Sequence, residues 1–141
     1  MTQEQKDLLL KDLCARVPYG VKYMRYSWDY DTDQELPVIE TLECADKDGY
    51  INHRRVYTVD DIKPYLFPLS SMTEEQKNDL IKNLKSNISV KNEEISFWNL
   101  YTANRMDQWK WVFEWCDKNH FDYRGLIPMG LAIDATGLNI Y

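Results

Sequence analysis

The sequence has 141 residues, 44% of them hydrophobic, and a net charge of −6 from 17 basic and 23 acidic side chains. The length suits one ordinary domain, and the apolar content is too high for a disordered chain. The acidic balance disfavours binding to nucleic acid and to anionic membranes, because both depend on basic side chains. We therefore expect no nucleic acid and no membrane among the partners.

Three cysteines are scattered along the chain without a CxxC pair, at Cys14, Cys44 and Cys116. An odd and sparse set of this kind indicates free thiols in a reducing compartment. The chain opens with a polar helical pattern instead of a signal peptide, and no run approaches the roughly 18 apolar residues of a membrane-spanning helix. The sequence therefore predicts a soluble, cytoplasmic protein.

The first predicted element is a helix over residues 3–16. Thr2 precedes Gln5 by three residues, which is the spacing of a capping box. In that motif the threonine hydroxyl accepts a hydrogen bond from an amide of the first turn, and the glutamine side chain accepts one from the cap amide. Pro18 ends the helix. The expected core-facing stripe comprises Leu10, Leu13, Cys14 and Val17.

Residues 21–59 change to the alternating period of β-strands. Met24, Tyr26 and Trp28 share one face of the first of three stretches rich in β-branched and aromatic residues. Asp48-Gly49 lies between the last two stretches and is a strong hairpin signal. We expect a three-stranded antiparallel meander made of residues 21–28, 36–44 and 50–59.

The next segment, residues 59–71, contains two prolines, which predict irregular structure with a short 3₁₀ turn near Asp61. A second helix follows over residues 74–86. Its start, MTEEQKNDLIKNL from Met72, resembles the opening MTQEQKDLLLKDL, with Thr73 and Gln76 in the capping-box positions. The recurrence indicates either a duplication or independent convergence on a good helix start. Convergence is favoured, because the residues that follow the two phrases do not align.

A third helix is predicted over residues 103–119, from a cap at Thr102. Before it, residues 94–101 form a short strand or an early helical turn, and after it residues 120–141 form a packed tail. At about 100° per residue, the helix carries two aromatic faces. The core-facing stripe comprises Met106, Trp109, Val112, Phe113 and Cys116. The other face carries Trp111 and Trp115, four residues apart, with Asn104 and Gln108 beside them.

The Trp111–Trp115 face has two explanations. In the favoured one the helix is sandwiched, with residues 96–101 or the C-terminal tail covering the face, because large exposed apolar patches are rare. In the other, Trp111 and Trp115, with Gln108 and Asn104, form an exposed anchor for a protein partner or a second copy of the chain, since tryptophan is enriched at interface hot spots. The overall prediction is a compact single α+β domain, with the small meander packed against about three helices.

Three phrases are specific enough to suggest a family: LLLKDLCARVPYGV (residues 8–21), IKPYLFPLSSMTEEQ (residues 62–76) and HFDYRGLIPMGLAIDATGLNIY (residues 120–141). Together they resemble a recurrent group of short proteins of gut Bacteroidales and of their phages and prophages. The resemblance covers both ends and the middle of the chain. It implies only a bacterial or phage intracellular setting and supplies no catalytic residues that could be assigned to this chain.

Residues 29–40 nearly fit the twelve-residue loop of calcium-binding helix–loop–helix proteins. Position six, where the pattern requires glycine, is Gln34, and strands instead of helices are predicted on both sides. An acidic hairpin tip has the same composition and is favoured, so no metal and no cofactor is predicted. In the weaker calcium alternative the ligands are Asp29, Asp31, Asp33 and Glu40.

Two further polar features each have two interpretations. Cys116 and His120 are four residues apart, so they form a nucleophilic pair or half a zinc site if the helix extends that far. A buried inert thiol is favoured, because Cys116 falls on the apolar stripe. Arg124 has the donors for a bidentate anion contact. Pairing with Asp122 or a neighbouring carboxylate is favoured instead, and would tie the tail down.

The sequence favours a non-enzymatic protein-binding or regulatory module, such as a phage or mobile-element accessory protein that acts on a host protein. It contains no recognisable set of nucleophile, base and stabilising donors. The alternative is a small hydrolase- or transferase-like enzyme that uses the scattered Asp, His and Cys residues.

Overall fold

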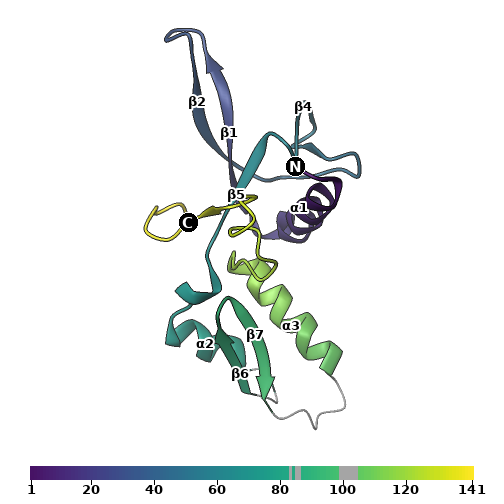
Figure 1. Ribbon diagram of the computed structural model, residues 1–141, viewed down its shortest axis with the longest axis vertical. Coiled ribbons are helices and arrows are strands. Elements are labelled where there is room, and N and C mark those ends of the chain that lie inside the picture. Colours follow the sequence, from purple (N-terminus) through teal and green to yellow (C-terminus); the bar gives the residue numbers. More distant parts are fainter. Residues whose placement is uncertain (83, 85–86, 99–104) are drawn as a thin grey trace.

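The computed structural model describes residues 1–82, 84, 87–98 and 105–141. Within these ranges the chain forms a single α+β domain with three α-helices, a curled mixed four-stranded sheet and two small hairpins (Figure 1). The predicted fold class is therefore confirmed. The helices are α1 (Gln3–Arg16), α2 (Glu74–Ile81) and α3 (Arg105–Lys118).

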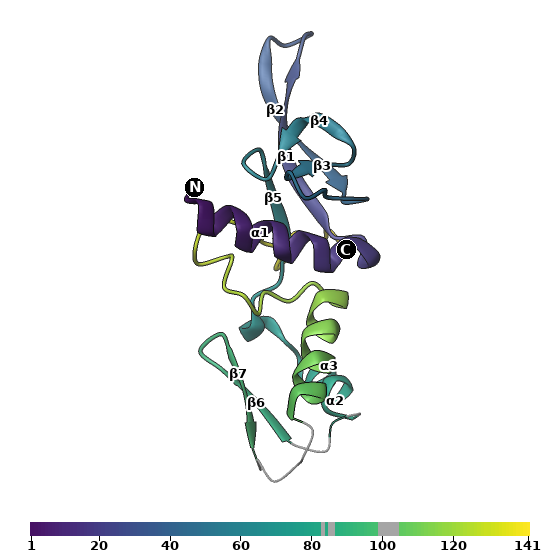
Figure 2. The same cartoon turned by 90° about the vertical axis from the view of Figure 1, so that its right-hand side faces the viewer.

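The four-stranded sheet has the strand order β2-β1-β5-β8. β1 pairs antiparallel with both β2 and β5, while β5 pairs parallel with β8. The bounds are β1 (Lys22–Asp29), β2 (Gln34–Thr41), β5 (Ile62–Leu66) and β8 (Ile133–Asp134). Beyond its pairing with β5, β1 continues with β2 as a two-stranded ribbon that projects from the molecule (Figures 1 and 2). We call this ribbon, residues 26–37, the arm.

The predicted meander is wrong in its third strand. The first two strands pair as expected, but the second neighbour of β1 is β5, in the segment expected to be irregular because of its prolines. Residues 50–59 instead form a separate hairpin, β3 (Tyr50–Ile51) with β4 (Arg54–Thr58). Its turn residues Asn52 and His53 have φ of 51° and 57°, which is the conformation of a two-residue type I′ turn.

Two turn predictions had mixed outcomes. The Asp48-Gly49 turn is present, with the Gly49 N–H donating to the Asp46 carbonyl at 3.0 Å. It closes only an isolated bridge between Ala45 and Ile51, so it does not join two long strands. The 3₁₀ turn expected near Asp61 lies further along the chain, at η2 (Leu69–Ser71).

The helix starts follow the sequence closely. α1 has the predicted bounds, and both capping boxes, Thr2 with Gln5 and Thr73 with Gln76, are formed. α2 ends earlier than predicted, at Ile81, and the chain continues into a hairpin of β6 (Asn87–Lys91) and β7 (Glu94–Trp98). β7 confirms the strand interpretation of the segment before α3, whereas β6 was not predicted. Thr102 and residues 103–104, where the third helix was predicted to begin, lie outside the described residues.

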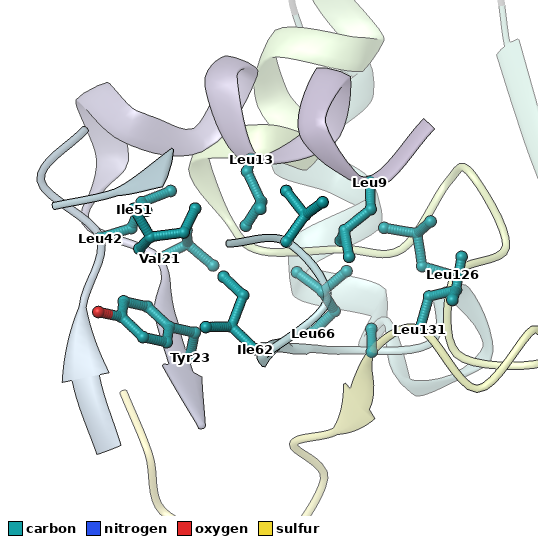
Figure 3. Packing of buried hydrophobic residues seen from close by; sticks show 12 residues of the cluster. Leu9, Leu13, Val21, Tyr23, Leu42, Ile51, Ile62, Leu66, Leu126 and Leu131 are labelled. Atoms are coloured by element: carbon teal, nitrogen blue, oxygen red, sulfur yellow. The ribbon is translucent and has the colours of Figure 1, made fainter. Parts of the chain in front are cut away.

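The first core cluster lies between α1, the sheet and the C-terminal tail (Figure 3). Its members include Leu9 and Leu13 of α1, Ile62 and Leu66 of β5, and Leu126 of the tail. The tail is thus packed, as predicted. The buried face of α1 differs from the predicted stripe, because it includes two charged residues, Asp12 and Arg16, while Cys14 is exposed.

The second core cluster lies between α2, α3 and η2, and contains Leu69, Met72, Leu80, Val112, Trp115, Cys116 and Phe121. The fully buried side chain of Arg16 connects it to the first cluster. Arg16 pairs with Asp12 at 2.8 Å within α1 and donates to the carbonyl oxygens of Cys116 (3.3 Å) and Phe121 (2.8 Å). α1 therefore lies across the middle of the molecule, between the two halves of the core (Figure 2).

Candidate functional site

The arm exposes a continuous row of large apolar side chains. Because side chains alternate along a strand, Met24, Tyr26 and Trp28 share one face of β1, and the pairing register places Ile39 and Pro37 beside them on β2. Tyr26 is 54% exposed, and Trp28 and Ile39 are each 48% exposed. We call these five residues the arm face; Tyr26, Trp28 and Pro37 lie on the arm, and Met24 and Ile39 lie at its base. Scattered single hydrophobic residues are common on protein surfaces, whereas a contiguous exposed group is less usual and makes this face a candidate interaction site.

The tip of the arm is acidic. No lysine or arginine occurs between Tyr26 and Ile39, whereas Asp29, Asp31, Asp33 and Glu35 all lie there. The Asp29 carboxylate organises the turn, since it accepts hydrogen bonds from the Thr32 hydroxyl (2.7 Å) and the Asp31 N–H (3.1 Å). These two hydrogen bonds lower the pKa of Asp29. Asp29 therefore carries its negative charge at neutral pH.

The calcium alternative does not fit this geometry. The register places Asp29 at one end of the arm and Glu40 near the other end of β2, roughly 20 Å away at about 3.3 Å per residue. Glu40 instead accepts hydrogen bonds from Arg25 and from the Tyr23 hydroxyl, each at 2.7 Å. The hydrogen bond from Arg25 is the main reason that its pKa falls to about 2. Asp29, Asp31 and Asp33 are thus the acidic hairpin tip favoured from the sequence.

A cavity of about 450 Å³ lies at the base of the arm, beside the turn that leads into β5. It is lined on one side by Met24 and Tyr26 of β1 and on the other by Val56, which is 77% exposed. Three acidic residues, Glu35, Asp60 and Asp61, also line it, against one basic residue, Lys63. The arm face and this cavity therefore form one surface that is apolar in the middle and negative at the edges.

The structure places Trp111 and Trp115 largely inside the protein. The indole N–H of Trp115 donates to Asp79 at 2.8 Å and that of Trp111 to the Leu80 carbonyl at 3.2 Å, so both anchor α3 to α2. The Trp115 ring also stacks on Phe121 of the tail at 5.6 Å. The favoured sandwiched arrangement is thus present, with α2 and the tail as the cover. Trp115 is only 6% exposed, which does not fit the exposed-anchor alternative.

The two other residues proposed for that anchor add no support to it. Gln108 is half-buried on α3 and makes contacts of its own, while Asn104 lies outside the described residues. The partly exposed aromatic face of α3 is instead the one predicted to be core-facing. Phe113 is 37% exposed there and stacks on Tyr123 at 4.7 Å.

A second cavity, of about 620 Å³, borders this aromatic face of α3. Its charged side chains already have partners, since Lys110 lies 4.0 Å from Glu114 and Arg124 pairs with Asp117 at 3.3 Å. The residues that line it therefore offer ring surfaces without an unpaired charge. The cavity at the arm is smaller, but it adjoins exposed rings and two carboxylates, Glu35 and Asp61, that form no ion pair with a described basic residue. It therefore has the stronger basis for selective recognition.

Arg124 is used within the protein. Its Nη1 donates to Asp12 at 2.6 Å and to Asp117 at 3.3 Å, and its guanidinium lies 4.3 Å above the Tyr123 ring. Internal pairing was the favoured interpretation, although the expected partner Asp122 accepts from the backbone N–H groups of Leu126 and Ile127 instead. The anion-contact alternative receives no support, because this guanidinium already has two carboxylate partners.

Cys116 and His120 are both buried. Burial raises the pKa of the Cys116 thiol to about 12, and burial together with the nearby Arg16 lowers the pKa of His120 to about 4. The thiol is therefore protonated and the imidazole neutral at pH 7. This pair lacks the thiolate that a cysteine nucleophile requires, so it gives no support to the enzymatic alternative. The three cysteines are free, as predicted.

Comparisons with protein-family models, with curated proteins and with solved structures find no match to this chain. The resemblance to short Bacteroidales and phage proteins thus stays a prediction. Across the described ranges, no helix is both long and apolar enough to cross a membrane. Fold and site together define a single-domain α+β protein with a projecting, partly apolar two-stranded arm.

The sequence did place Met24, Tyr26 and Trp28 on a common face, but it did not identify that face as exposed. The signal for exposure lies in the neighbouring residues. The acidic run from Asp29 to Glu35 is longer than a tight hairpin turn requires, and charged residues of this kind are almost never buried without partners. An aromatic face that continues into such a run is typical of a projecting hairpin.

Proposed function

We propose that this protein is a non-enzymatic protein-binding module that contacts its partner through the arm face. The observation that carries the proposal is the group of Tyr26 and Trp28 on the projecting arm and Ile39 at its base, each about half exposed. Removing apolar surface from water is favourable by roughly 25 cal/mol per Å², and aromatic residues are enriched in the centres of interfaces. A partner that covers this row would gain both contributions.

The charge around the arm favours a protein partner over a nucleic acid or a membrane. Stacking on exposed aromatic rings is also used to bind single-stranded nucleic acid, but such sites lie in positively charged grooves. The arm tip has the opposite sign, with Asp29, Asp31, Asp33 and Glu35 and no basic residue among them. Phosphate groups would be repelled from this surface, whereas basic side chains of a protein would be attracted.

The resemblance to Bacteroidales and phage proteins suggests the setting of this function. In that setting the protein acts as a phage or mobile-element accessory protein, and the arm contacts a protein of the bacterial host. Small accessory proteins of this kind need a stable domain and an exposed recognition surface. The buried core and the projecting arm support this division of roles.

The proposal is tested by removing the arm face while the core stays intact. We expect the double variant Tyr26→Ser with Trp28→Ser to unfold at nearly the wild-type urea concentration, because neither residue belongs to a core cluster. In affinity capture from a bacterial lysate, the variant should lose the proteins that the wild type retains. The matched control is Tyr30→Ser, which removes an aromatic ring that is 89% exposed at the tip, outside the arm face.

The control should retain the same proteins as the wild type. An arm-face variant that captures every wild-type partner would show that recognition occurs elsewhere on the molecule. A strongly lowered unfolding midpoint would show that the arm face has a structural role.

A further inference from the structure

The arm has an unpaired strand edge. β2 pairs with β1 along the whole strand, whereas β5 pairs with β1 only at residues 23–25. The chain turns away just before β5, where the Asp61 N–H donates to the Thr58 carbonyl at 3.0 Å instead of continuing the ladder. Within the described part of the chain, residues 26–29 of β1 therefore have no neighbouring strand on that side.

Two prolines reveal which backbone groups face this edge. Pro64 lies opposite Tyr23 in β5, and Pro37 lies opposite Tyr26 in β2. Proline has no N–H, so both must be non-hydrogen-bonded pairs of the antiparallel ladder. Because backbone groups alternate in direction along a strand, those of Tyr26 and Trp28 point away from β2. The carbonyl of Tyr26 and both backbone groups of Trp28 are thus directed toward the free edge.

The two edges of the arm differ in their capacity to accept another strand. Since the pair of Pro37 with Tyr26 is non-hydrogen-bonded, the nitrogen of Pro37 lies on the outer edge of β2. A strand that docked there would meet a position without a donor, which is a common way to protect an edge. The edge of β1 at residues 26–29 contains no proline and is roughly 13 Å long at about 3.3 Å per residue.

The surroundings of the β1 edge define the chemistry of an incoming strand. The cavity of about 450 Å³ lies beside the start of β5, where residues 60–63 line it together with Met24 and Tyr26 of β1. Asp29, Glu35 and Asp61 lie beside this edge or cavity, and none of them forms an ion pair with a described basic residue. An incoming strand whose apolar side chains cover the arm face directs its alternate side chains to the opposite face of β1. Asp29 lies on that face beside the acidic tip, so basic residues at the alternate positions would be attracted there.

We propose that an extended segment of the partner protein, in which apolar residues alternate with lysine or arginine, adds to the sheet along residues 26–29 of β1. This inference rests on the proposed function and states how the partner binds. Main-chain hydrogen bonds then supply affinity, and the alternating side chains supply specificity. A second copy of this chain is the less suitable occupant, because pairing two arms would bring the acidic tip of each copy near the carboxylates of the other.

The test follows individual backbone amides by hydrogen exchange, with a short synthetic peptide of alternating lysine and valine as the probe. In the free protein the Trp28 N–H should exchange quickly, and the peptide should slow it by about tenfold or more. The matched control within the protein is the Ser27 N–H, which points toward β2 in the deduced pattern and should be slow with and without the peptide.

Two control peptides separate strand addition from other modes of binding. Methylation of the probe's nitrogens at alternate residues removes its donors and should abolish the protection of Trp28. A peptide of alternating glutamate and valine should protect Trp28 at least about tenfold less at low salt. Equal protection by the acidic peptide would overturn the charge assignment.

The outcomes distinguish this inference from the proposed function. If the probe shifts the ring signals of Tyr26 and Trp28 in NMR spectra but leaves the Trp28 N–H unprotected, strand addition is wrong and the arm face still binds. The probe can also change neither the ring signals nor the Trp28 N–H exchange. If the double variant Tyr26→Ser with Trp28→Ser then still fails to capture the lysate proteins that the wild type retains, the inference is again wrong and the proposed function stands. A dimer that disappears in Trp28→Ser would identify the second copy as the occupant and overturn the inference.

Discussion

His120 is held by packing and backbone geometry. Its φ is 62°, in the left-handed region, and its ring stacks on the Tyr141 ring at 3.9 Å. The Tyr141 hydroxyl in turn donates to the Tyr65 carbonyl at 2.8 Å and accepts from the Lys22 N–H at 3.0 Å, which ties the end of the chain to the sheet. The Nδ1 atom of His120 is buried, with no hydrogen-bond partner in the described ranges. The site therefore favours the neutral imidazole.

This environment predicts a pH dependence of stability. Burial, with a contribution from the positive charge of Arg16, lowers the pKa of folded His120 from 6.5 to about 4. The unfolded chain thus binds a proton more readily, and the free energy of unfolding should fall as the pH drops from about 6.5 toward 4. Urea unfolding of the wild type and of His120→Asn between pH 7.5 and pH 4 measures the effect. The variant should lose less stability than the wild type.

The matched control is His53→Asn. His53 also has a positive φ, 57°, but lies exposed in the turn between β3 and β4. Asparagine tolerates this backbone conformation at both positions, so the two variants differ mainly in burial. His53→Asn should retain the wild-type pH profile. Identical profiles for the wild type and His120→Asn would show that His120 is not the group responsible.

At the scale of elements, the two capping boxes have the same geometry. In each, the glutamine N–H donates to the threonine hydroxyl at 3.2 Å and the glutamine side chain accepts from the threonine N–H at 2.9 Å. Each box thus satisfies two amides at a helix start. The shared phrase at the two helix starts has this local physical function, whatever its evolutionary origin.

We expect Thr73→Ala to reduce the free energy of unfolding by about 0.5–2 kcal/mol, because it removes the acceptor for the Gln76 N–H. Thr2→Ala removes the equivalent acceptor for the Gln5 N–H and should have an effect of similar size. Urea denaturation of both variants measures the two effects, with Thr136→Ala as an exposed control outside any helix. An unchanged midpoint for Thr73→Ala would contradict the importance of the cap.

For the whole molecule, Arg16 is the main polar connection between the two core clusters. Its guanidinium lies between Asp12 and the end of α3, where it satisfies the carbonyl oxygens of Cys116 and Phe121. Burial alone would lower the pKa of Arg16, but the charge and hydrogen bonds of Asp12 outweigh it and raise the pKa. The residue therefore stays charged inside the protein.

Arg16→Met should cost about 3–5 kcal/mol of unfolding free energy, as is typical when one member of a buried charge network is removed. Chemical denaturation followed by tryptophan fluorescence and by far-ultraviolet circular dichroism is the measurement. Both probes should report one common transition, because the two clusters form one domain. Lys11→Met, on the exposed side of the same helix, is the control and should change stability by less than about 0.5 kcal/mol. A loss below about 1 kcal/mol for Arg16→Met would contradict the role of this connection.

The sequence by itself determined the features that depend on near neighbours along the chain. Both helix starts were predicted, because a capping box closes within four residues. The pairing of β1 with β2 was predicted from alternation and a short acidic connection. The shared face of Met24, Tyr26 and Trp28 follows from the same alternation, so the composition of the arm face was accessible from the sequence.

The tertiary structure decided which distant segments meet. A strand excludes proline only at positions where the backbone nitrogen would have to donate a hydrogen bond. Whether position 64 is such a position depends on the register of β5 with β1. In the observed register Pro64 lies opposite Tyr23 in a non-hydrogen-bonded pair, so the proline did not prevent β5 from forming a strand. In α3, the covered aromatic face is the one that α2 and Phe121 reach, which buries Trp115 and leaves Phe113 partly exposed. The helical period defines both faces but does not choose between them.

The exposure of the arm face was decided in the same way. β5 ends its pairing at Arg25, so Tyr26 and Trp28 lie beyond the body of the sheet, with an open strand edge beside them. Local sequence fixes the direction of each side chain, because that direction depends on backbone geometry. Burial depends on contacts between residues far apart in the chain, and these form only where the whole set of elements packs together.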